Sequence, residues 1–170
     1  MLKIALSAII IASGSMLGIG LGHVLRERVR VLEELITSLL DLRSDVGFLH
    51  TPMPQIFARL AGRYGAVSFL YAQCLVDEGD KTADLSQVWE AAATDFVKKE
   101  TQGAEVLEAL IHLGGGLGKS DGETQLTRID RTIVRLEACL LTAKEKSRRM
   151  GPVYNHAGTA ASVLLVLLLI

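Results

Sequence analysis

The chain is poor in proline, aromatic residues and cysteine, and each shortage limits the folds available to it. Only 3 of its 170 residues are proline (Pro52, Pro54 and Pro152), so two long stretches contain no residue that interrupts a helix. Aromatic residues make up 5% of the chain, although apolar residues make up 49%. No segment alternates apolar and polar residues as a half-buried strand does. The composition therefore indicates an all-α protein, part of which faces lipid.

Residues that commonly carry chemistry are also sparse. The two cysteines, Cys74 and Cys139, fall in predicted helices, and we expect both to be reduced and buried. Four histidines lie far apart, with no cysteine or carboxylate at metal-ligand spacing: His23, His50, His112 and His156. No spacing suggests a nucleophile with its base. We therefore expect no metal, no other cofactor, no small-molecule substrate and no enzymatic activity.

The two ends of the chain hold the long apolar runs. Residues 4–22 contain no charge, and as a helix they would span roughly 28 Å, about the thickness of the hydrocarbon core of a bilayer. Residues 157–170 are also uncharged, and a helix begun at Val153 would span about 27 Å. We predict transmembrane helices at residues 1–23 and 151–170. A cleaved signal peptide is the alternative for the first, and a buried core helix for the second.

Charge distribution orients the intervening domain, residues 24–150. Residues 31–143 carry 17 acidic but only 10 basic residues, while basic residues gather beside both apolar runs. This asymmetry predicts a cytoplasmic domain whose basic end lies on anionic lipid headgroups. A nucleic-acid partner is disfavoured, because these cations have no aromatic neighbours. The predicted lipid-facing residues are Arg26, Arg28, Arg30, Lys144, Lys146, Arg148 and Arg149.

Small residues recur within both apolar runs at helical spacing. Gly14, Gly18 and Gly22 are four residues apart, so on a helix they form one stripe that a second helix can approach closely. Gly158 and Ser162 give the last segment a similar strip. We expect these residues to pack the two spans against each other or against another membrane protein.

Helical periodicity continues through the middle of the chain. Apolar residues from Leu25 to Leu49 recur every three or four positions, which predicts a helix that extends the first span to about residue 49. Residues 50–55 end it, with Thr51 as the cap of the next helix. Four shorter helices are predicted after this turn, at about residues 52–62, 65–78, 84–100 and 103–113. Trp89, in the third of these, is expected to anchor the core.

The last soluble helix has the most regular pattern. Apolar positions from Leu126 to Met150 follow alternating steps of three and four, as expected for a seam that packs along the first long helix. Gly151 and Pro152 should kink or interrupt it. The predicted fold is an antiparallel six-helix bundle between two terminal transmembrane helices.

One stretch, LGGGLGKS at residues 113–120, has the appearance of a phosphate-binding loop. Such a loop requires glycine five residues before the Gly-Lys pair, and that position is Leu113. It also follows a buried strand, whereas residues 105–112 have helical spacing. The structural alternative is a turn in which Gly114 to Gly116 end one helix and Ser120 or Asp121 caps the next.

Taken together, these features resemble the stage III sporulation protein AB family of endospore-forming bacteria. The residues that carry the resemblance are the apolar segment at each end, His50-Thr51-Pro52-Met53, Leu113-Gly114, Leu117-Gly118, Ser120-Asp121 and Gln125. The resemblance implies a membrane protein on the mother-cell side of the channel complex between mother cell and forespore. It also implies a cytoplasmic bundle similar to the F-type platform proteins of type II secretion.

The same resemblance implies a scaffold role and its partners. These would be other membrane proteins of the channel and its secretion-type ATPase, stage III sporulation protein AA, which would supply the nucleotide chemistry. We expect a partner to bind the two turns far from the membrane, at His50, Thr51, Pro52, Gly114, Leu117, Gly118, Ser120, Asp121 and Gln125. The alternatives are a nucleotide-binding membrane enzyme that uses the 114–120 loop, with Lys119, and a helical membrane sensor.

Overall fold

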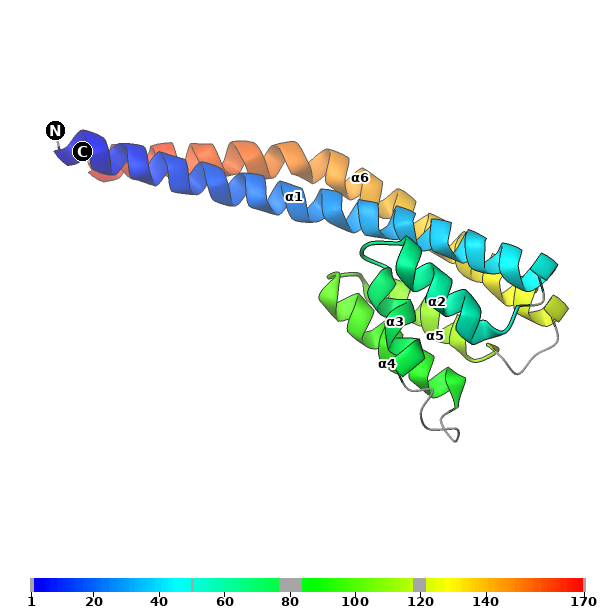
Figure 1. Ribbon diagram of the computed structural model, residues 1–170. Coiled ribbons are helices and arrows are strands. Elements are labelled where there is room, and N and C mark those ends of the chain that lie inside the picture. The colour runs from blue at the N-terminus through cyan, green and yellow to red at the C-terminus, as the bar shows by residue number, and fades with distance from the viewer. Residues whose placement is uncertain (1, 50, 77–83, 118–121, 170) are drawn as a thin grey trace. The chain divides into compact units, whose positions relative to one another are not determined.

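The computed structural model describes residues 2–49, 51–76, 84–117 and 122–169, and every regular element among them is helical (Figure 1). This confirms the predicted all-α fold. The elements are six α-helices and one short π-helix, η1, which continues the first helix. Their bounds are α1 (Leu2–Ser44), η1 (Asp45–Leu49), α2 (Met53–Arg63), α3 (Ser68–Val76), α4 (Leu85–Lys99), α5 (Ala104–Gly114) and α6 (Gly122–Leu169).

Two compact units divide the chain. The bundle unit comprises residues 30–140, and the paired-helix unit comprises residues 1–29 and 141–170. The long helices α1 and α6 each contribute to both units. Within the paired-helix unit, the beginning of α1 and the end of α6 run antiparallel and lie at the same end of that unit (Figure 1).

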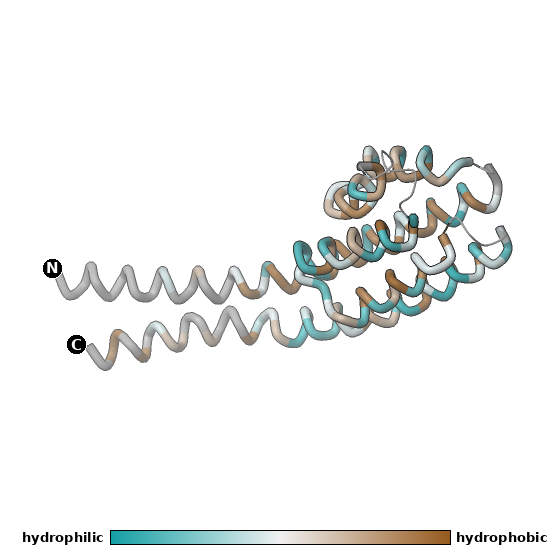
Figure 2. Tube along the Cα trace, turned by 90° about the horizontal axis from the view of Figure 1, so that it is seen from below, coloured by the Kyte–Doolittle hydropathy of each residue, from teal (hydrophilic) through white to brown (hydrophobic). Residues whose placement is uncertain are grey.

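Amphipathic helices build the core of the bundle unit. Hydrophobic and hydrophilic segments alternate along them (Figure 2), as expected when each helix buries one face. From α1 the core takes Leu35, Leu39 and Leu42, and from α6 it takes Ile129 and Leu136, all fully buried. The predicted apolar faces of the two long helices include all of these residues except Leu35, which lies one helical turn from Leu39. Arg43 of α1 forms an ion pair with Asp130 of α6, so the expected pairing of α1 with α6 is present within this unit.

Three aromatic side chains lie at the centre of the bundle unit. Phe57 of α2, Tyr71 of α3 and Trp89 of α4 are each 0 or 1% exposed. Their ring centroids are 5.7 Å apart for Phe57 and Tyr71, 5.8 Å for Phe57 and Trp89, and 6.1 Å for Tyr71 and Trp89. Such tilted and offset contacts stabilise a core beyond the burial of area alone. The prediction that Trp89 anchors the core is confirmed.

Two hydrogen bonds fix the polar atoms of this aromatic cluster. The indole nitrogen of Trp89 donates to the carbonyl of Leu110 in α5, over 2.7 Å. The Tyr71 hydroxyl lies 2.9 Å from the hydroxyl of buried Ser38 in α1, which in turn donates to the Leu35 carbonyl. Buried polar groups need such partners, because leaving one unpaired costs about 1–3 kcal/mol. The cluster thereby connects α2, α3 and α4 to α1 and α5.

The end of α5 depends on a glycine because it meets Trp89. A Cβ atom on Gly114 would lie 2.4 Å from Cδ1 of the indole ring, well inside van der Waals contact. The Gly114 carbonyl also accepts a hydrogen bond of 2.7 Å from the Ser86 hydroxyl near the start of α4. The backbone at Gly114 is therefore held against α4 from two directions.

Several local expectations are corrected by the structure. Pro52, not Thr51, occupies the cap position of α2, and no side chain caps this helix. Helix α6 continues through Gly151 and Pro152 instead of being interrupted there, since a proline removes one backbone hydrogen bond, which a long helix can tolerate. Cys74 is buried as expected, whereas Cys139 is only partly buried, because it lies at the edge of the α6 seam.

The terminal segments give a different outcome. Within the part of the chain that the structure describes, no helix is both long enough and apolar enough to cross a membrane. Most side chains of residues 1–23 and half of the side chains of residues 151–170, where the sequence predicts the two spans, fall outside that part. Both spans therefore stay predictions.

Replacing Gly114 with alanine should destabilise the protein by about 1–3 kcal/mol, because the added methyl group displaces a fully buried indole. Gly115→Ala is the matched control, since its Cβ would have no neighbour closer than 3.9 Å. Urea denaturation of the full-length protein, followed by fluorescence of its 1 tryptophan, measures both variants. Equal midpoints for the two variants would contradict the proposed contact.

Burial raises the pKa of Tyr71 above its ordinary value, an effect that the hydrogen bond with Ser38 only partly offsets. A raised folded-state pKa stabilises the protein below the unfolded pKa of about 10, and this stability is lost as the pH rises toward the folded value. The urea midpoint should therefore decrease from about pH 9 to about pH 11 less steeply in Tyr71→Phe than in the unsubstituted protein. Parallel pH profiles would count against this role of the buried hydroxyl.

Candidate functional site

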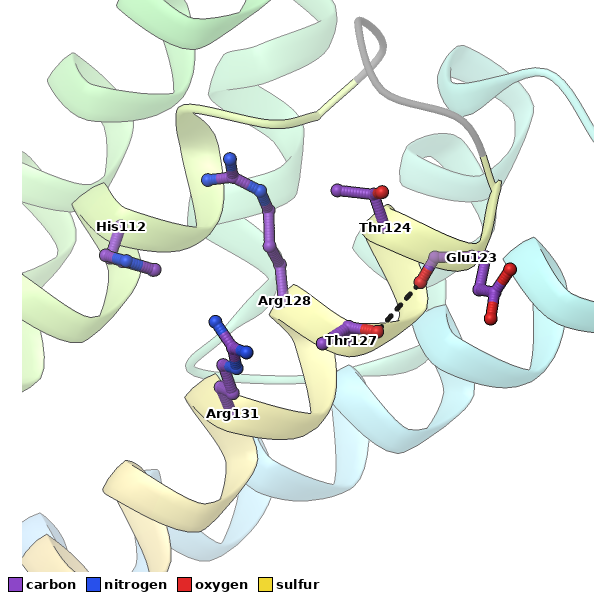
Figure 3. A pocket seen from close by; sticks show the side chains of 6 residues that line it. All are labelled: His112, Glu123, Thr124, Thr127, Arg128 and Arg131. Carbon is purple, nitrogen blue, oxygen red and sulfur yellow. Dashed lines mark hydrogen bonds between the residues drawn. The ribbon is translucent and has the colours of Figure 1, made fainter.

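A hollow of about 440 Å³ lies in the bundle unit, where the end of α5 faces the first turns of α6 (Figure 3). Its position, beside the turn that contains the glycine run, makes it the main candidate site in the described part of this unit. Helix α5 contributes one lining residue and α6 contributes the others. The lining residues are His112, Glu123, Thr124, Thr127, Arg128 and Arg131.

Cations dominate this hollow. Arg128 and Arg131 are three residues apart on α6, so both project from the same face of the helix, and His112 faces them from α5 (Figure 3). Among the described residues, no salt bridge involves either guanidinium group. Glu123 supplies one negative charge at the start of α6. The two arginines and Glu123 together give the hollow a formal charge of about +1.

Gly116 makes room for one of these arginines. A Cβ atom at this position would lie 2.5 Å from Cδ and 2.6 Å from Nε of Arg128. The Arg128 side chain consequently lies directly against the backbone of the turn, with its guanidinium group turned toward the hollow (Figure 3). The glycine run thus has two packing functions, because Gly114 admits Trp89 and Gly116 admits Arg128.

The helical segments next to the two turns predicted to bind a partner meet in the bundle unit. A Cβ atom on Gly47 in η1 would lie 3.5 Å from a methyl group of Leu126, so the end of the α1–η1 segment meets the start of α6. Beside it, Arg59 of α2 forms an ion pair with the buried carboxylate of Asp45. These contacts fix the segment that leads into the first turn.

The predicted turn residues have different environments. Pro52 is exposed and Thr51 is partly exposed, whereas Gly114 and Leu117 are buried and hold the second turn in place. Gln125 is 9% exposed. The remaining predicted positions lie outside the described residues: His50, Gly118, Ser120 and Asp121. Binding of a partner to these turns therefore stays a prediction.

The predicted lipid-facing cations fall into both units. Arg26, Lys144 and Arg148 line a second hollow of about 230 Å³ in the paired-helix unit, together with Val29 and Ser147. Arg30 belongs to the bundle unit and lies 3.2 Å from the carboxylate of Glu34. The other cations are in the paired-helix unit, where Arg28 is half-buried and Lys146 and Arg149 are exposed, Arg149 being 2.6 Å from Glu145.

The small residues predicted to pack the terminal helices are partly described. Gly22 and Ser162 are both buried within the paired-helix unit. The surroundings of Gly14, Gly18 and Gly158 are not among the features that the structure describes. Their role in helix packing stays a prediction.

Sequence reasoning missed the hollow at the end of α5. Arg128 and Arg131 flank the apolar seam of α6, where a cation is ordinarily interpreted as a solvated surface residue. His112 has no cysteine or carboxylate at metal-ligand spacing, so the sequence predicts only a lone polar residue at this position. The available signal was the pair of arginines three apart, close after a glycine-rich turn. Across the described residues, no group of three or more histidine, cysteine or acidic side chains is placed to hold a metal ion.

The class of the protein follows from its fold. It is an all-α protein in which two long helices, the first and last in the chain, flank four short helices in sequence. The family model of stage III sporulation protein AB matches residues 3–170. The chain therefore belongs to the stage III sporulation protein AB family.

A solved structure supports the fold. The chain is similar to a structure described as stage III sporulation protein AB (SpoIIIAB), with a TM-score of 0.65 and 22% sequence identity. The similarity covers 71% of this chain and 96% of the other. No curated protein sequence matches the chain.

Proposed function

We propose that this sporulation protein is a non-catalytic scaffold of the secretion-like channel complex between mother cell and forespore, and that endospore formation requires it. The observation that carries the proposal is its membership of the stage III sporulation protein AB family over residues 3–170. In this role the bundle unit receives protein partners, among them the complex's secretion-type ATPase, stage III sporulation protein AA. The ATPase then supplies the nucleotide chemistry.

The paired-helix unit is proposed to hold the protein at the mother-cell membrane, with the bundle unit in the cytoplasm. Large apolar side chains are exposed along both helices of the unit, which is typical of a surface that contacts lipid or another protein. They are Met16 at 77%, Leu21 at 53%, Val24 at 48%, Leu141 at 69%, Val153 at 52%, Leu164 at 64% and Leu167 at 73%. The hollow lined by Arg26, Lys144 and Arg148 provides cations for anionic headgroups in the same unit.

The scaffold proposal is favoured over a nucleotide-binding enzyme by the packing of the glycine run. In a phosphate-binding loop, glycines allow backbone N–H groups to surround the phosphates. Here Gly114 and Gly116 are explained by their contacts with Trp89 and Arg128. Residues 105–112 before the loop belong to helix α5, where a phosphate-binding loop would follow a strand.

Deleting the gene should abolish heat-resistant spores, and the unsubstituted chain should restore them.

Reversing two charges in the paired-helix unit, with Arg26→Glu and Arg148→Glu, should lower spore yield at least about tenfold, because each basic residue contributes about 1 kcal/mol near anionic lipid. Lys98→Glu with Arg135→Glu, two exposed cations of the bundle unit, is the control. Full sporulation by the deletion strain would refute the proposed function.

Lys119→Ala tests the enzymatic alternative. A phosphate-binding loop loses nucleotide affinity without its lysine, whereas a scaffold turn does not depend on that amine. We expect normal spore yield from Lys119→Ala and no binding of labelled ATP to the purified full-length protein. Saturable ATP binding that disappears in this variant, together with a sporulation defect, would favour the enzyme.

A further inference from the structure

We infer that the hollow between α5 and α6 is a docking site for an acidic side chain of a partner protein, held by Arg128 and Arg131. This inference rests on the proposed scaffold function and assigns a specific chemistry to one of its contacts. Its basis is a cavity, a pair of arginines without acidic partners among the described residues, and a glycine that positions one of them.

The geometry of the hollow suits a carboxylate. Arg128 and Arg131 project from one face of α6, and His112 lies opposite them on α5, so a group that enters meets donors from two helices (Figure 3). Guanidinium groups present paired N–H donors that match the two oxygens of a carboxylate. At about 440 Å³ the hollow is larger than one carboxylate needs, so it can also admit neighbouring atoms of an acidic segment.

Charge distinguishes a carboxylate from a phosphate. Glu123 lines the same hollow and reduces its formal charge to about +1, which one carboxylate neutralises. A phosphate group carries about −1.5 to −2 at neutral pH and would leave an excess of negative charge next to Glu123. The occupant that best balances the site is therefore an aspartate or glutamate side chain.

The surrounding surface restricts the partner further. Residues 30–140 carry 17 acidic residues but only 11 basic ones, so the bundle unit as a whole repels acidic surfaces. The hollow is thus a local positive site on a negatively charged unit. The complementary partner surface carries an isolated acidic side chain among neutral or basic residues. Such a pattern fixes the orientation of docking as well as its affinity.

Gly116 connects this site to the glycine-rich turn. An alanine there would have to displace the middle of the Arg128 side chain, which is flexible and can move at little cost in stability. The same change at Gly115 would bring its Cβ no closer than 4.0 Å to Arg128. The two glycines are adjacent, yet only Gly116 should affect the position of the guanidinium group.

Site-specific crosslinking in sporulating cells identifies the occupant. A photoreactive residue, p-benzoylphenylalanine, replaces Thr127, which lines the hollow, and mass spectrometry maps the crosslinked peptide. We expect a defined peptide from one channel-complex protein, with an aspartate or glutamate at or next to the crosslinked position. Arg128→Glu with Arg131→Glu should reduce the yield of this crosslink about tenfold, as expected for partly exposed ion pairs. Reversing the acidic residue of the partner to lysine should restore it.

Two matched pairs of variants separate docking from folding. Arg128→Gln with Arg131→Gln should lower crosslinking and spore yield, whereas Arg135→Gln, an exposed arginine of α6 outside the hollow, should change neither. Gly116→Ala should lower crosslinking without a change in the urea midpoint, and Gly115→Ala should leave both unchanged. Because Gly116→Ala alters no charge, it tests the position of Arg128 independently.

The outcomes also separate this inference from the proposed function. If gene deletion prevents sporulation but the Arg128 and Arg131 variants sporulate and crosslink normally, the docking site is refuted and the scaffold function stands. A crosslink to lipid, or to a peptide without acidic residues, would overturn the assignment of a carboxylate. Failure of the charge reversal in the partner to restore the crosslink would also overturn it.

Discussion

The contact between Trp89 and Gly114 is the constraint on which the rest of the bundle unit depends. The indole ring is fully buried, its nitrogen bonds to α5, and its faces meet aromatic rings from α2 and α3. Four helices therefore meet at one side chain. The ring can occupy this position only because the last residue of α5 has no Cβ. Close packing in the core therefore requires glycine at position 114, where the turn begins.

This constraint extends to the surface through two further glycines. Once Gly114 is fixed against Trp89, the backbone continues through Gly115 to Gly116, against which the Arg128 side chain lies. The order of the turn residues is therefore linked to the position of a guanidinium group in the hollow. Residues 114–116 therefore serve both the core and the proposed docking site, because Gly114 packs against Trp89 and Gly116 against Arg128. A glycine run that resembles a phosphate-binding loop is in this protein a point of close packing.

Local sequence patterns predicted most of the helices, and their failures have physical causes. Residues 84–100 and 103–113 were expected to be helical, and α4 and α5 span Leu85–Lys99 and Ala104–Gly114. The helix caps were harder to predict, because Thr51 and Pro52 are neighbours and either could occupy the cap position of α2. Only the path of the chain determines that Pro52 does so. Pro152 illustrates the same limit, since its local preference is outweighed by a long helix on both sides. The hollow at α5 and α6 could not be predicted, because its residues are far apart in sequence and become neighbours only when α5 packs beside α6.

The sequence by itself determined the all-α class, the apolar faces of the two long helices, the buried position of Trp89 and the resemblance to the sporulation family. These follow from periodicity and residue type, which act over a few turns of chain. Only the tertiary structure decided why Gly114 and Gly116 are glycines and that His112 faces Arg131. These features depend on the close approach of atoms from different helices, which cannot be predicted from the spacing of residues along the sequence.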